Sequence, residues 1–280
     1  MAEAMTTSAM IADQSSGVLV SFDNVRLGFD EGDILRGLSF RVAAGETKVL
    51  IGETGAGKTL VLKLAAGLLH PDAGSVRVLG RDLRELSEEE LFAFRRKIGF
   101  VFQEGALFDS LTVGENVAYR LREEHVDDDE IEARVLESLR FVELEETVER
   151  FPSELSGGMR RRVAIARALV DHPAIVLYDS PTAGLDPITS QTIITLILRL
   201  RDLQGVTSLL ATQRLQDAFG LANYRYDAAS NRVVPVVAGG AAHGGPETRF
   251  VVLRDGESYF EGEPQALAES SDGYLKSFLV

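Results

Sequence analysis

Nine consecutive residues in the first quarter of the chain are of types suited to holding phosphate. They are Gly52, Glu53, Thr54, Gly55, Ala56, Gly57, Lys58, Thr59 and Leu60. The first eight fit G-x-x-x-x-G-K-[ST], in which the glycines let backbone N–H groups close around a phosphate. We expect Lys58 to reach the β- and γ-phosphates of a nucleotide and the Thr59 hydroxyl to bind Mg²⁺. The spacing therefore predicts a site for a nucleoside triphosphate with Mg²⁺.

The segments on either side of this loop predict the elements that it needs. Thr47–Ile51 is an apolar, β-branched run typical of a buried strand, and Leu60–Ala66 is typical of a helix that ends at Gly67. A loop between a strand and a helix places the phosphate at the positive end of the helix dipole. A glycine-rich turn that matched the pattern by chance would lack these flanking elements.

The composition is that of a globular protein, and the net charge bears on whether its main partner is a nucleic acid. The chain has 280 residues, of which 45% are hydrophobic and 26% charged, enough for one large α/β domain or two small ones. A formal net charge of −14 argues against nucleic acid as the main partner. The absence of cysteine excludes disulfides and suits a reducing compartment. We find neither an apolar run of about 18 residues nor a signal peptide, so any membrane role is expected to come through a partner.

Strand and helix signals alternate along most of the chain. Strands are predicted at Val18–Phe29 (as an antiparallel pair), Leu38–Val42, Ser75–Leu79, Ile98–Phe102, Ile175–Asp179 and Val206–Ala211. Helices are predicted from a capping box at Ser87 to about Arg96, and at Val113–Arg120, Asp128–Phe141, Ser156–Val170 and Pro187–Gln204. The pattern predicts a mostly parallel, covered α/β sheet. Because residues 104–170 hold few strand signals, we predict a helical subdomain there, inserted between core segments 18–103 and 171–280.

Two segments are expected to lie outside this core. Residues 1–17 are small and polar and predict a disordered tail. Tyr224–Glu247 is dense in glycine in its second half and predicts a mobile surface insertion that is no part of the nucleotide site. Strands at Phe250–Leu253 and Ser258–Glu261 then predict a hairpin that turns at the Asp-Gly pair between them.

Further motifs occur in the order found in one protein family. Leu155–Met159 has the five-residue LSGGM sequence, Gln103 follows a predicted strand, Ile175–Asp179 is an apolar strand that ends in a carboxylate, and Ala183–Asp186 has the sequence AGLD. Over residues 18–280 the chain resembles the ATP-binding-cassette (ABC) ATPases in their signature, Q-loop, Walker B strand and D-loop. The resemblance implies a P-loop NTPase with a RecA-like core, an antiparallel β subdomain and ATP as the nucleotide. It also implies that Phe29 is the aromatic residue that stacks on adenine.

The resemblance assigns a role to each motif. Asp179 is expected to hold Mg²⁺ with Thr59, and Gln103, which senses the γ-phosphate, is a third candidate metal ligand. Ser156, Gly157 and Gly158 of the signature form an anion site at a helix N-terminus, which in this family caps the γ-phosphate bound to a second subunit. Two ATP molecules would thus join a head-to-tail dimer. Residues 104–112 correspond to the segment with which family members contact their transmembrane partner.

Two longer segments narrow the resemblance. Phe102–Phe108 and Glu115–Arg122, together with Gly184–Ser190, look like the ATPase of Mla-type transporters, which are linked to MCE lipid-binding proteins. That subfamily moves phospholipids between the membranes of diderm bacteria. The resemblance therefore implies an integral membrane permease, a second ABC subunit, an MCE-type partner and a place on the cytoplasmic face of the inner membrane. Cassettes for other substrates that share these segments are the alternative.

The chain departs from the family pattern at two catalytic positions. Ser180 stands where the family has a glutamate that activates water, and Gln213 stands where it has a histidine. Loss of a general base typically costs about 10²- to 10⁴-fold in rate. Glu104 or Asp186 could supply the missing carboxylate, but the spacing of the motifs does not argue for either residue. An engineered trap that keeps ATP bound would also carry such a change, but the double change favours a naturally degenerate site.

Three functions fit these observations to different extents. The first is the nucleotide-binding subunit of a membrane lipid transporter, and the second is a low-turnover, nucleotide-gated module that pairs with a competent ATPase. The third is a soluble cassette that acts on DNA or ribosomes. The negative charge and the single cassette argue against the third. Copurification with a permease would favour the first, and ATP-dependent dimerisation without one would favour the second.

Overall fold

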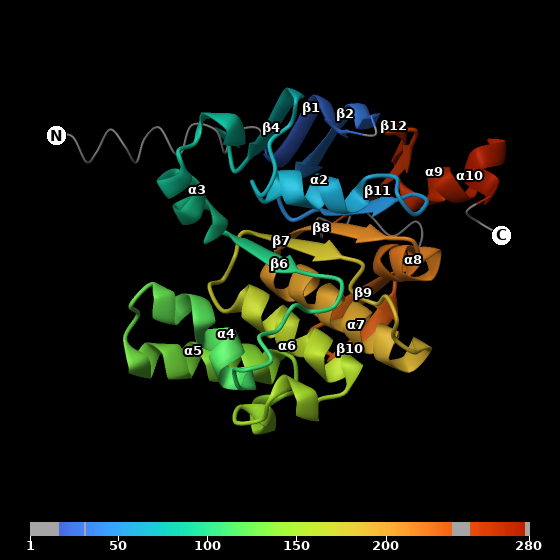
Figure 1. Ribbon diagram of the computed structural model, residues 1–280. Helices are drawn as coiled ribbons and strands as arrows, with labels where there is room; N and C mark the ends of the chain where they lie inside the picture. Colours follow the sequence, from blue (N-terminus) through green and yellow to red (C-terminus); the bar gives the residue numbers. More distant parts are fainter. Residues whose placement is uncertain (1–16, 31, 237–246, 278–280) are drawn as a thin grey trace.

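The computed structural model describes residues 17–30, 32–236 and 247–277, and its centre is a six-stranded sheet (Figure 1). Neighbouring strands run parallel except at one edge, where β12 pairs antiparallel with β11. The strand order is β12 (Glu257–Gly262), β11 (Thr248–Arg254), β3 (Thr47–Ile51), β8 (Thr207–Thr212), β7 (Ile175–Asp179) and β6 (Ile98–Val101). The prediction of a mostly parallel α/β sheet is confirmed.

Strand β3 shows why the centre of the sheet is largely apolar on both faces; its one charged residue, Lys48, is paired with Glu46 and Glu261. All five of its residues are buried. Val49 and Ile51 belong to the hydrophobic core on one face of the sheet, and Leu50 belongs to the core on the other. Because both faces of this strand are covered, neither face needs polar side chains, and apolar and polar residues do not alternate along it.

A smaller antiparallel sheet covers one face of the central sheet. Its order is β2 (Gly32–Ala43), β1 (Val18–Phe29), β4 (Ala73–Val78) and β5 (Arg81–Asp82). Helix α2 (Lys58–Ala65) lies between the two sheets (Figure 1), and its Val61 and Leu62 share a core with residues of both. The helix that follows the predicted phosphate loop is thereby held from two sides.

The strands of this sheet differ from the prediction. Val18–Phe29 is not a pair of strands but one strand, which pairs with β2 along its length, and Leu38–Val42 is only the latter part of β2. Alternation alone does not separate one long strand from two short ones, and no glycine or proline interrupts β1 before Gly28. The register shifts between Phe22 and Val25, where Asn24 has a φ of 49°, so a bulge bends the strand without ending it.

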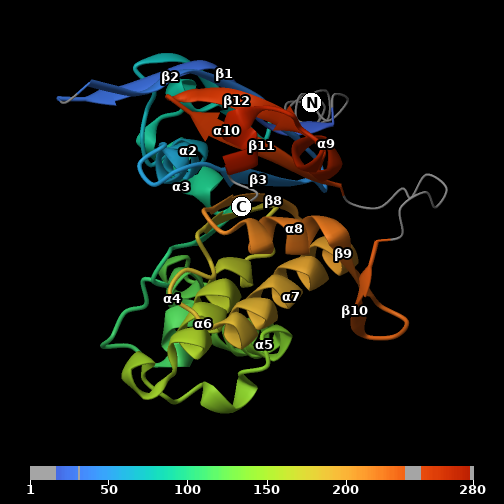
Figure 2. The ribbon, with the colours of Figure 1, turned by 90° about the vertical axis from the view of Figure 1, so that its right-hand side faces the viewer.

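Helices cover the other face of the central sheet (Figure 2). Three of them, α4, α5 and α6, follow β6 and precede β7, in the segment predicted to be helical. Within the described residues, the α-helices besides α2 are α3 (Glu88–Arg95), α4 (Val113–Glu123), α5 (Asp128–Phe141), α6 (Gly157–Leu169), α7 (Pro187–Gln204), α8 (Leu215–Asn223), α9 (Pro264–Ala268) and α10 (Gly273–Ser277). Among the described residues, none of the helices is both long and apolar enough to span a bilayer.

Side-chain caps explain why several predicted helix ends agree with the structure. Ser87 and Thr112 form capping boxes at the starts of α3 and α4, and Asp127 caps α5. Asp186 accepts hydrogen bonds from two backbone N–H groups at the start of α7, where Pro187 occupies the first turn. These residues satisfy N–H groups that have no partner inside the helix, so the local sequence determines where the helix begins.

The segment 224–247 was predicted to be a surface insertion, and the structure corrects this for its first part. Here β9 (Tyr224–Asp227) and β10 (Arg232–Pro235) form a hairpin packed on α7. Tyr226 is 9% exposed and belongs to the hydrophobic core. One aromatic residue on a short strand carries too weak a periodic signal to be recognised from the sequence. Residues 237–246, with the glycine-rich run, and the tail 1–16 lie outside the described residues.

Candidate nucleotide-binding site

The predicted phosphate loop connects β3 to α2 and contains glycines at positions that exclude a side chain. Gly57 has a φ of 89°, and a Cβ atom there would lie 2.8 Å from Cδ2 of Leu35. A Cβ atom on Gly52 would lie 2.8 Å from the carbonyl oxygen of Leu253. Close packing therefore requires glycine at both positions, and at Gly57 the backbone conformation requires it as well. The loop's outer residues, Glu53, Thr54 and Gly55, are exposed, and Ala56, Thr59 and Leu60 are half-buried.

Lys58 lies in the first turn of α2, with 8% of its surface exposed. Its ammonium donates hydrogen bonds to the carbonyl oxygens of Gly52 and Glu53, both at 2.8 Å. Burial lowers the pKa of Lys58, and the nearby Asp179 carboxylate partly opposes that shift. A poorly hydrated cation held in this way by its own loop is well placed to attract phosphate.

Thr59 and Asp179, which come from distant parts of the sequence, are in direct contact. The Thr59 hydroxyl donates to the Asp179 carboxylate, at 2.9 Å from Oδ2 and 3.1 Å from Oδ1. Asp179 ends β7 and is 6% exposed. A hydroxyl and a carboxylate at one point fit Mg²⁺, which takes oxygen ligands and commonly uses one or two carboxylates together with phosphate oxygens. The residues present therefore fit the predicted metal.

Ser180 directly follows Asp179 and is equally enclosed. It is 7% exposed, its backbone N–H donates to the Ala211 carbonyl at 2.8 Å, and its φ is 48°. Its hydroxyl makes a long contact of 3.5 Å with Asp179 Oδ1. A non-glycine residue in the left-handed region is uncommon and is found preferentially at functional sites. The structure thus keeps an unusual backbone at a position whose side chain cannot act as a carboxylate base.

Gln213 follows β8, the strand next to β3, and reaches the phosphate loop. The Thr54 hydroxyl donates to Oε1 of Gln213 at 2.8 Å. Ile51 and Thr212 are paired across these two parallel strands, so the residues after them emerge at the same edge of the sheet. Position 213 is therefore held beside the loop, as a neutral amide rather than an imidazole.

Gln103 is exposed in the turn after β6, and no bond joins it to Asp179 or Thr59 in the described structure. The neighbouring residue Arg161, on α6, donates to the carbonyl oxygens of Phe102 at 2.9 Å and Ala183 at 3.3 Å. Burial lowers the pKa of Arg161, and Glu104 and Asp179 oppose the shift. Arg161 connects the segment around Gln103 to the AGLD segment, a role that the sequence reading missed, although the residue stands in a run of three arginines on an apolar helix.

The signature lies at the start of α6, on the helical part of the molecule (Figure 1). Ser156 is exposed and caps the helix by accepting from the Met159 N–H at 3.2 Å. Gly157 is exposed, with no side chain closer than 3.7 Å to a Cβ built on it. A Cβ on Gly158 would lie 2.2 Å from Cγ2 of Thr189, so this glycine lets α6 approach α7. The two signature glycines thus have different local surroundings.

Two aromatic residues are candidates for contact with the nucleotide base: Phe29, which was predicted, and Tyr274, which lines a pocket beside the loop whose lining does not include Phe29. Phe29, at the end of β1, is 54% exposed, so its ring is accessible for stacking. A pocket of about 380 Å³ adjoins the loop residues Thr54 and Ala56 and is also lined by Arg254 and Tyr274. The sequence reading did not anticipate Tyr274, because it approaches the loop only through the tertiary fold.

Comparisons with known proteins agree with this arrangement. The family model described as ABC transporter matches residues 35–183. The chain is 37% identical over 211 residues to the intermembrane phospholipid transport system ATP-binding protein MlaF of Haemophilus influenzae, covering 74% of this chain and 80% of that protein. It is 45% identical to the chloroplastic protein TRIGALACTOSYLDIACYLGLYCEROL 3 of Arabidopsis thaliana over 66% of this chain, and 39% identical to the methionine import protein MetN of Bifidobacterium longum over 72%. The chain spans about half the length of these last two relatives, at 56% and 47%.

A solved structure gives the same result. A dimeric structure of the ATP-binding cassette MJ0796 in a post-hydrolysis state, bound to ADP and Pi, superposes with a TM-score of 0.71 at 31% sequence identity. The match covers 88% of this chain and 98% of that one. With the family model, the relatives and the loop geometry in agreement, this chain belongs to the ATP-binding subunits of the ABC transporter family.

Proposed function

We propose that this chain binds Mg-ATP at the Lys58–Thr59–Asp179 site and acts as a slow ATPase subunit that drives a lipid-transporting permease. The observation that carries the proposal is the bonded pair of Thr59 and Asp179 beside the buried ammonium of Lys58. All three groups needed to hold a triphosphate and its metal meet at one edge of the sheet. Mg²⁺, when bound with the nucleotide, would neutralise charge on the phosphate oxygens.

The second half of each site is proposed to come from another subunit. Ser156 and Gly157 are exposed at the start of a long helix, and the related cassette MJ0796 is dimeric with ADP and Pi bound. Exposed backbone N–H groups there suit the γ-phosphate of a nucleotide on a partner. Either a homodimer or a heterodimer satisfies this arrangement.

Slow turnover is proposed because no carboxylate occupies the position after Asp179. Of the two candidate replacements, Asp186 accepts hydrogen bonds from Ile188, from the Thr189 backbone and from the Thr189 hydroxyl, and is committed to starting α7. Glu104 is exposed near Arg161 and remains the better candidate for a substitute base. A low-turnover module that pairs with a competent ATPase is the second candidate function, and Ser180 is the residue that favours it.

A permease is proposed to bind in a groove on the side of the molecule opposite the hairpin β11–β12. The groove has a volume of about 360 Å³, and its lining includes Phe100, Phe102, Phe108 and Tyr119. Two ring pairs form its walls, with centroid distances of 4.2 Å for Phe100–Phe102 and 4.7 Å for Phe108–Tyr119. Phe108 and Tyr119 are 44% and 42% exposed. Such exposed apolar surface suits a helix of a membrane partner.

The loop that borders this groove is held by one buried amide. Asn116 has no exposed surface and accepts from the Phe108 N–H at 2.8 Å. Its Nδ2 lies within 3.1 Å of the carbonyl oxygens of Phe108, Leu111 and Thr112. These hydrogen bonds hold the loop five residues after Gln103, and we propose that the loop passes a movement of the permease toward that residue.

The lipid substrate is proposed from the relatives. MlaF is named for intermembrane phospholipid transport and the plant relative for a galactolipid, whereas MetN is named for methionine import. Partners would then include an integral membrane permease and an MCE-type protein. The subunit would be peripheral on the cytoplasmic face of the inner membrane.

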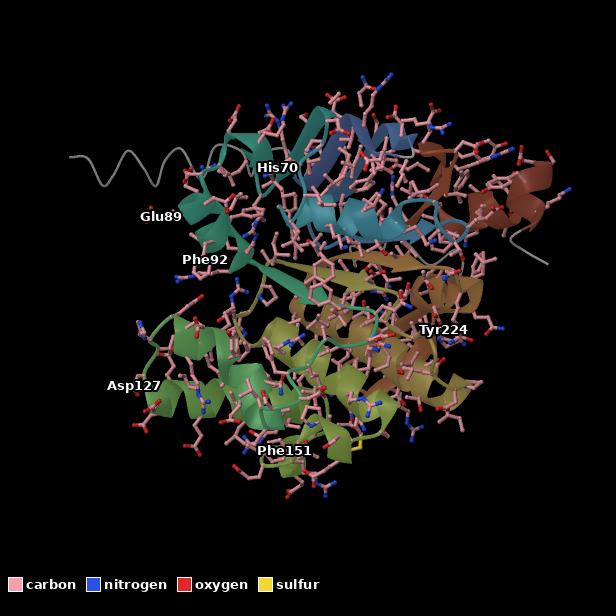
Figure 3. The ribbon with its side chains drawn as sticks, viewed as in Figure 1. His70, Glu89, Phe92, Asp127, Phe151 and Tyr224 are labelled. Atoms are coloured by element: carbon pink, nitrogen blue, oxygen red, sulfur yellow. The ribbon has the colours of Figure 1, made fainter. Side chains whose placement is uncertain are left out.

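The groove can be tested with a matched pair of aromatic substitutions. Phe108→Asp should reduce recovery of the membrane permease from detergent extracts at least about tenfold, because it puts a charge in an apolar contact. Phe151→Asp is the control, since Phe151 is 42% exposed but is not among the residues that line the groove. It lies at the lower end of the molecule in Figure 3. Equal recovery with both variants would contradict the proposed groove.

The substrate is tested on the recovered complex in vesicles. We expect ATP-dependent transfer of a fluorescent phospholipid to an acceptor vesicle. Transfer of methionine instead, with no phospholipid movement, would overturn the lipid assignment. If the chain dimerises with ATP but no permease is recovered with it, the second candidate function, a low-turnover nucleotide-gated module, would be favoured.

A further inference from the structure

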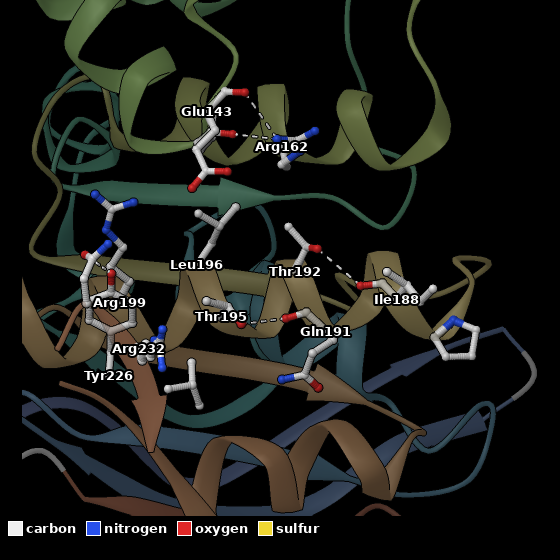
Figure 4. A pocket seen from close by; sticks show the side chains of 14 residues that line it. Glu143, Arg162, Ile188, Gln191, Thr192, Thr195, Leu196, Arg199, Tyr226 and Arg232 are labelled. Carbon is white, nitrogen blue, oxygen red and sulfur yellow. Dashed lines mark hydrogen bonds between the residues drawn. The ribbon is translucent and has the colours of Figure 1, made fainter. Parts of the chain in front are cut away.

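A second groove runs along the exposed face of α7, and none of its lining residues belongs to the nucleotide loop or the permease groove (Figure 4). It has a volume of about 600 Å³. One wall is the β9–β10 hairpin, and the other comes from the end of α5 and from α6. The hairpin that the sequence suggested was an appendage therefore builds a surface feature.

The floor of this groove is uncharged over most of its length. The Thr192 and Thr195 hydroxyls donate to carbonyl oxygens of their own helix, those of Ile188 at 3.2 Å and Gln191 at 2.9 Å (Figure 4). Their hydroxyl protons are therefore already donated within the helix. Ile188 at one end is 82% exposed, an unusual exposure for a large apolar side chain in a well-folded helix.

Arg199 at the other end is held in place without an acidic partner among the described residues. Its guanidinium lies 4.9 Å from the ring centroid of Phe141 and 5.9 Å from that of Tyr226. One terminal nitrogen donates to the Phe141 carbonyl at 3.3 Å, while Nε is buried with no hydrogen-bond partner in the described structure. Because the guanidinium is already held in place by the rings and the Phe141 carbonyl, its other terminal nitrogen would lose little conformational freedom on binding a carboxylate.

Two more arginines line the same groove. Arg162 uses one nitrogen on the carbonyl oxygens of Val142 and Glu143, at 3.0 and 3.3 Å, and Arg232 is exposed on β10. Glu143 is the one acidic residue among those that line the groove. The lining thus has three guanidinium groups and one carboxylate, on a chain whose net charge is −14. Asp227, which is paired with Arg232 across the hairpin, accepts hydrogen bonds from Ser230.

We propose that this α7 groove binds a short segment of a partner protein that carries an acidic side chain flanked by apolar residues. The acidic side chain would pair with Arg199 and Arg232, and the apolar residues would lie on the α7 face toward Ile188. From Ile188 to Arg199 the helix rises about 17 Å, which about five extended residues would span. Charge complementarity selects an acidic segment over a basic one, and the apolar floor distinguishes it from a free anion.

The test is selection of random 12-residue peptides displayed on phage against the purified full chain. Peptides that also bind the Arg199→Gln/Arg232→Gln variant are removed first. We expect the remaining peptides to contain Asp or Glu next to apolar residues. A synthetic copy of the most enriched peptide should bind the wild type, measured by fluorescence anisotropy, with its affinity lowered at least about tenfold by Arg232→Gln.

Matched variants separate groove binding from misfolding. Arg225→Gln lies on the same hairpin but is not among the residues that line the groove, so it should leave peptide affinity unchanged. Arg232 is exposed, so Arg232→Gln should keep the melting temperature and the ATP affinity of the wild type. Enriched peptides without acidic residues, an equal loss with Arg225→Gln, or no peptide that depends on Arg232 would each overturn the proposal.

Discussion

Two groups of polar residues lie at the carboxyl edge of the central sheet. One, the complete group, has the residue types expected for binding ATP, and the other, the incomplete group, lacks the residue types expected for hydrolysing it. At the ends of β3 and β7, Lys58, Thr59 and Asp179 are joined by short bonds or by charge, and each is of the type its proposed task requires. One residue further along β7, and after β8, stand Ser180 and Gln213, which are equally well positioned but lack a carboxylate and an imidazole. The backbone of the second group is retained while its chemistry is changed. Binding of ATP and its hydrolysis are thus expected to be separable in this protein.

The largest expected effect comes from breaking the complete group. Lys58→Ala removes a buried cation whose role we propose to be phosphate binding, and ATP affinity should fall by about 1,000-fold or become unmeasurable, since charge-assisted hydrogen bonds to phosphate are strong. Lys63→Ala, on the same helix but away from the loop, should bind ATP normally. Isothermal titration calorimetry with Mg-ATP makes the measurement. Normal affinity in Lys58→Ala would show that the nucleotide binds elsewhere.

The next effect comes from restoring the incomplete group. Ser180→Glu combined with Gln213→His should raise steady-state phosphate release by about 100-fold, the typical contribution of a general base, while ATP affinity stays within about threefold. Ser180→Ala is the control and should leave the residual rate unchanged, because a serine is not the base.

Wild-type turnover of about 1 s⁻¹ or more, with no gain from Ser180→Glu, would instead mean that another residue is the base. Glu104 would be examined first in that case. If Glu104→Gln then abolished turnover, the site would be complete by another route, and the contrast between the two groups would disappear.

A third, smaller effect distinguishes the two signature glycines. Gly158→Ala forces a methyl group against Thr189 and should lower the free energy of unfolding by about 1–3 kcal/mol. Gly157→Ala, which meets no atom closer than 3.7 Å, should cost little stability. Thr189→Ser removes the methyl group that a side chain at 158 would meet, so the double variant should recover much of the loss in urea unfolding. No recovery would mean that the α6–α7 contact is not the cause.

The smallest effect concerns the support behind Ser180 and Gln213. Asp217 is 5% exposed and accepts from the Thr182 hydroxyl, and burial raises its pKa. A carboxyl whose pKa is raised by folding stabilises the protein fully below its unfolded value, about 3.9, and that stability is lost as the pH rises through the folded value. The melting temperature of Asp217→Asn should therefore rise relative to that of the wild type as the pH rises above about 4. Each 1 kcal/mol of stability that the wild type loses corresponds to about 2–4 °C. A constant difference across that range would contradict the shift.

Some of the fold is visible in the sequence because the signals are local. The ends of α5 and α7 agree with the prediction because Asp127, Asp186 and Pro187 act on the turn next to them. The buried strand β3 is recognisable because four of its five residues are apolar or β-branched. Local signals do not separate one long strand from two short ones, which is why β1 was predicted as a pair. Nor do they show that Tyr226 is buried, since its neighbours on α7 lie about 30 residues away.

By itself, the sequence determined the phosphate-loop motif, the order of motifs and the presence of Ser180 and Gln213 where the family resemblance implies a glutamate and a histidine. Each of these depends on the identity of a side chain at a fixed spacing. Only the tertiary structure decided which of these residues meet. Thr59 touches Asp179 across 120 positions, Thr54 touches Gln213 across 159, and Arg161 links two loops that no spacing connects. These contacts follow from the order of parallel strands in the sheet, which brings the ends of β3, β7 and β8 to one edge. The α7 groove depends in the same way on a hairpin folding back onto a helix, so its surface exists only once the chain has folded.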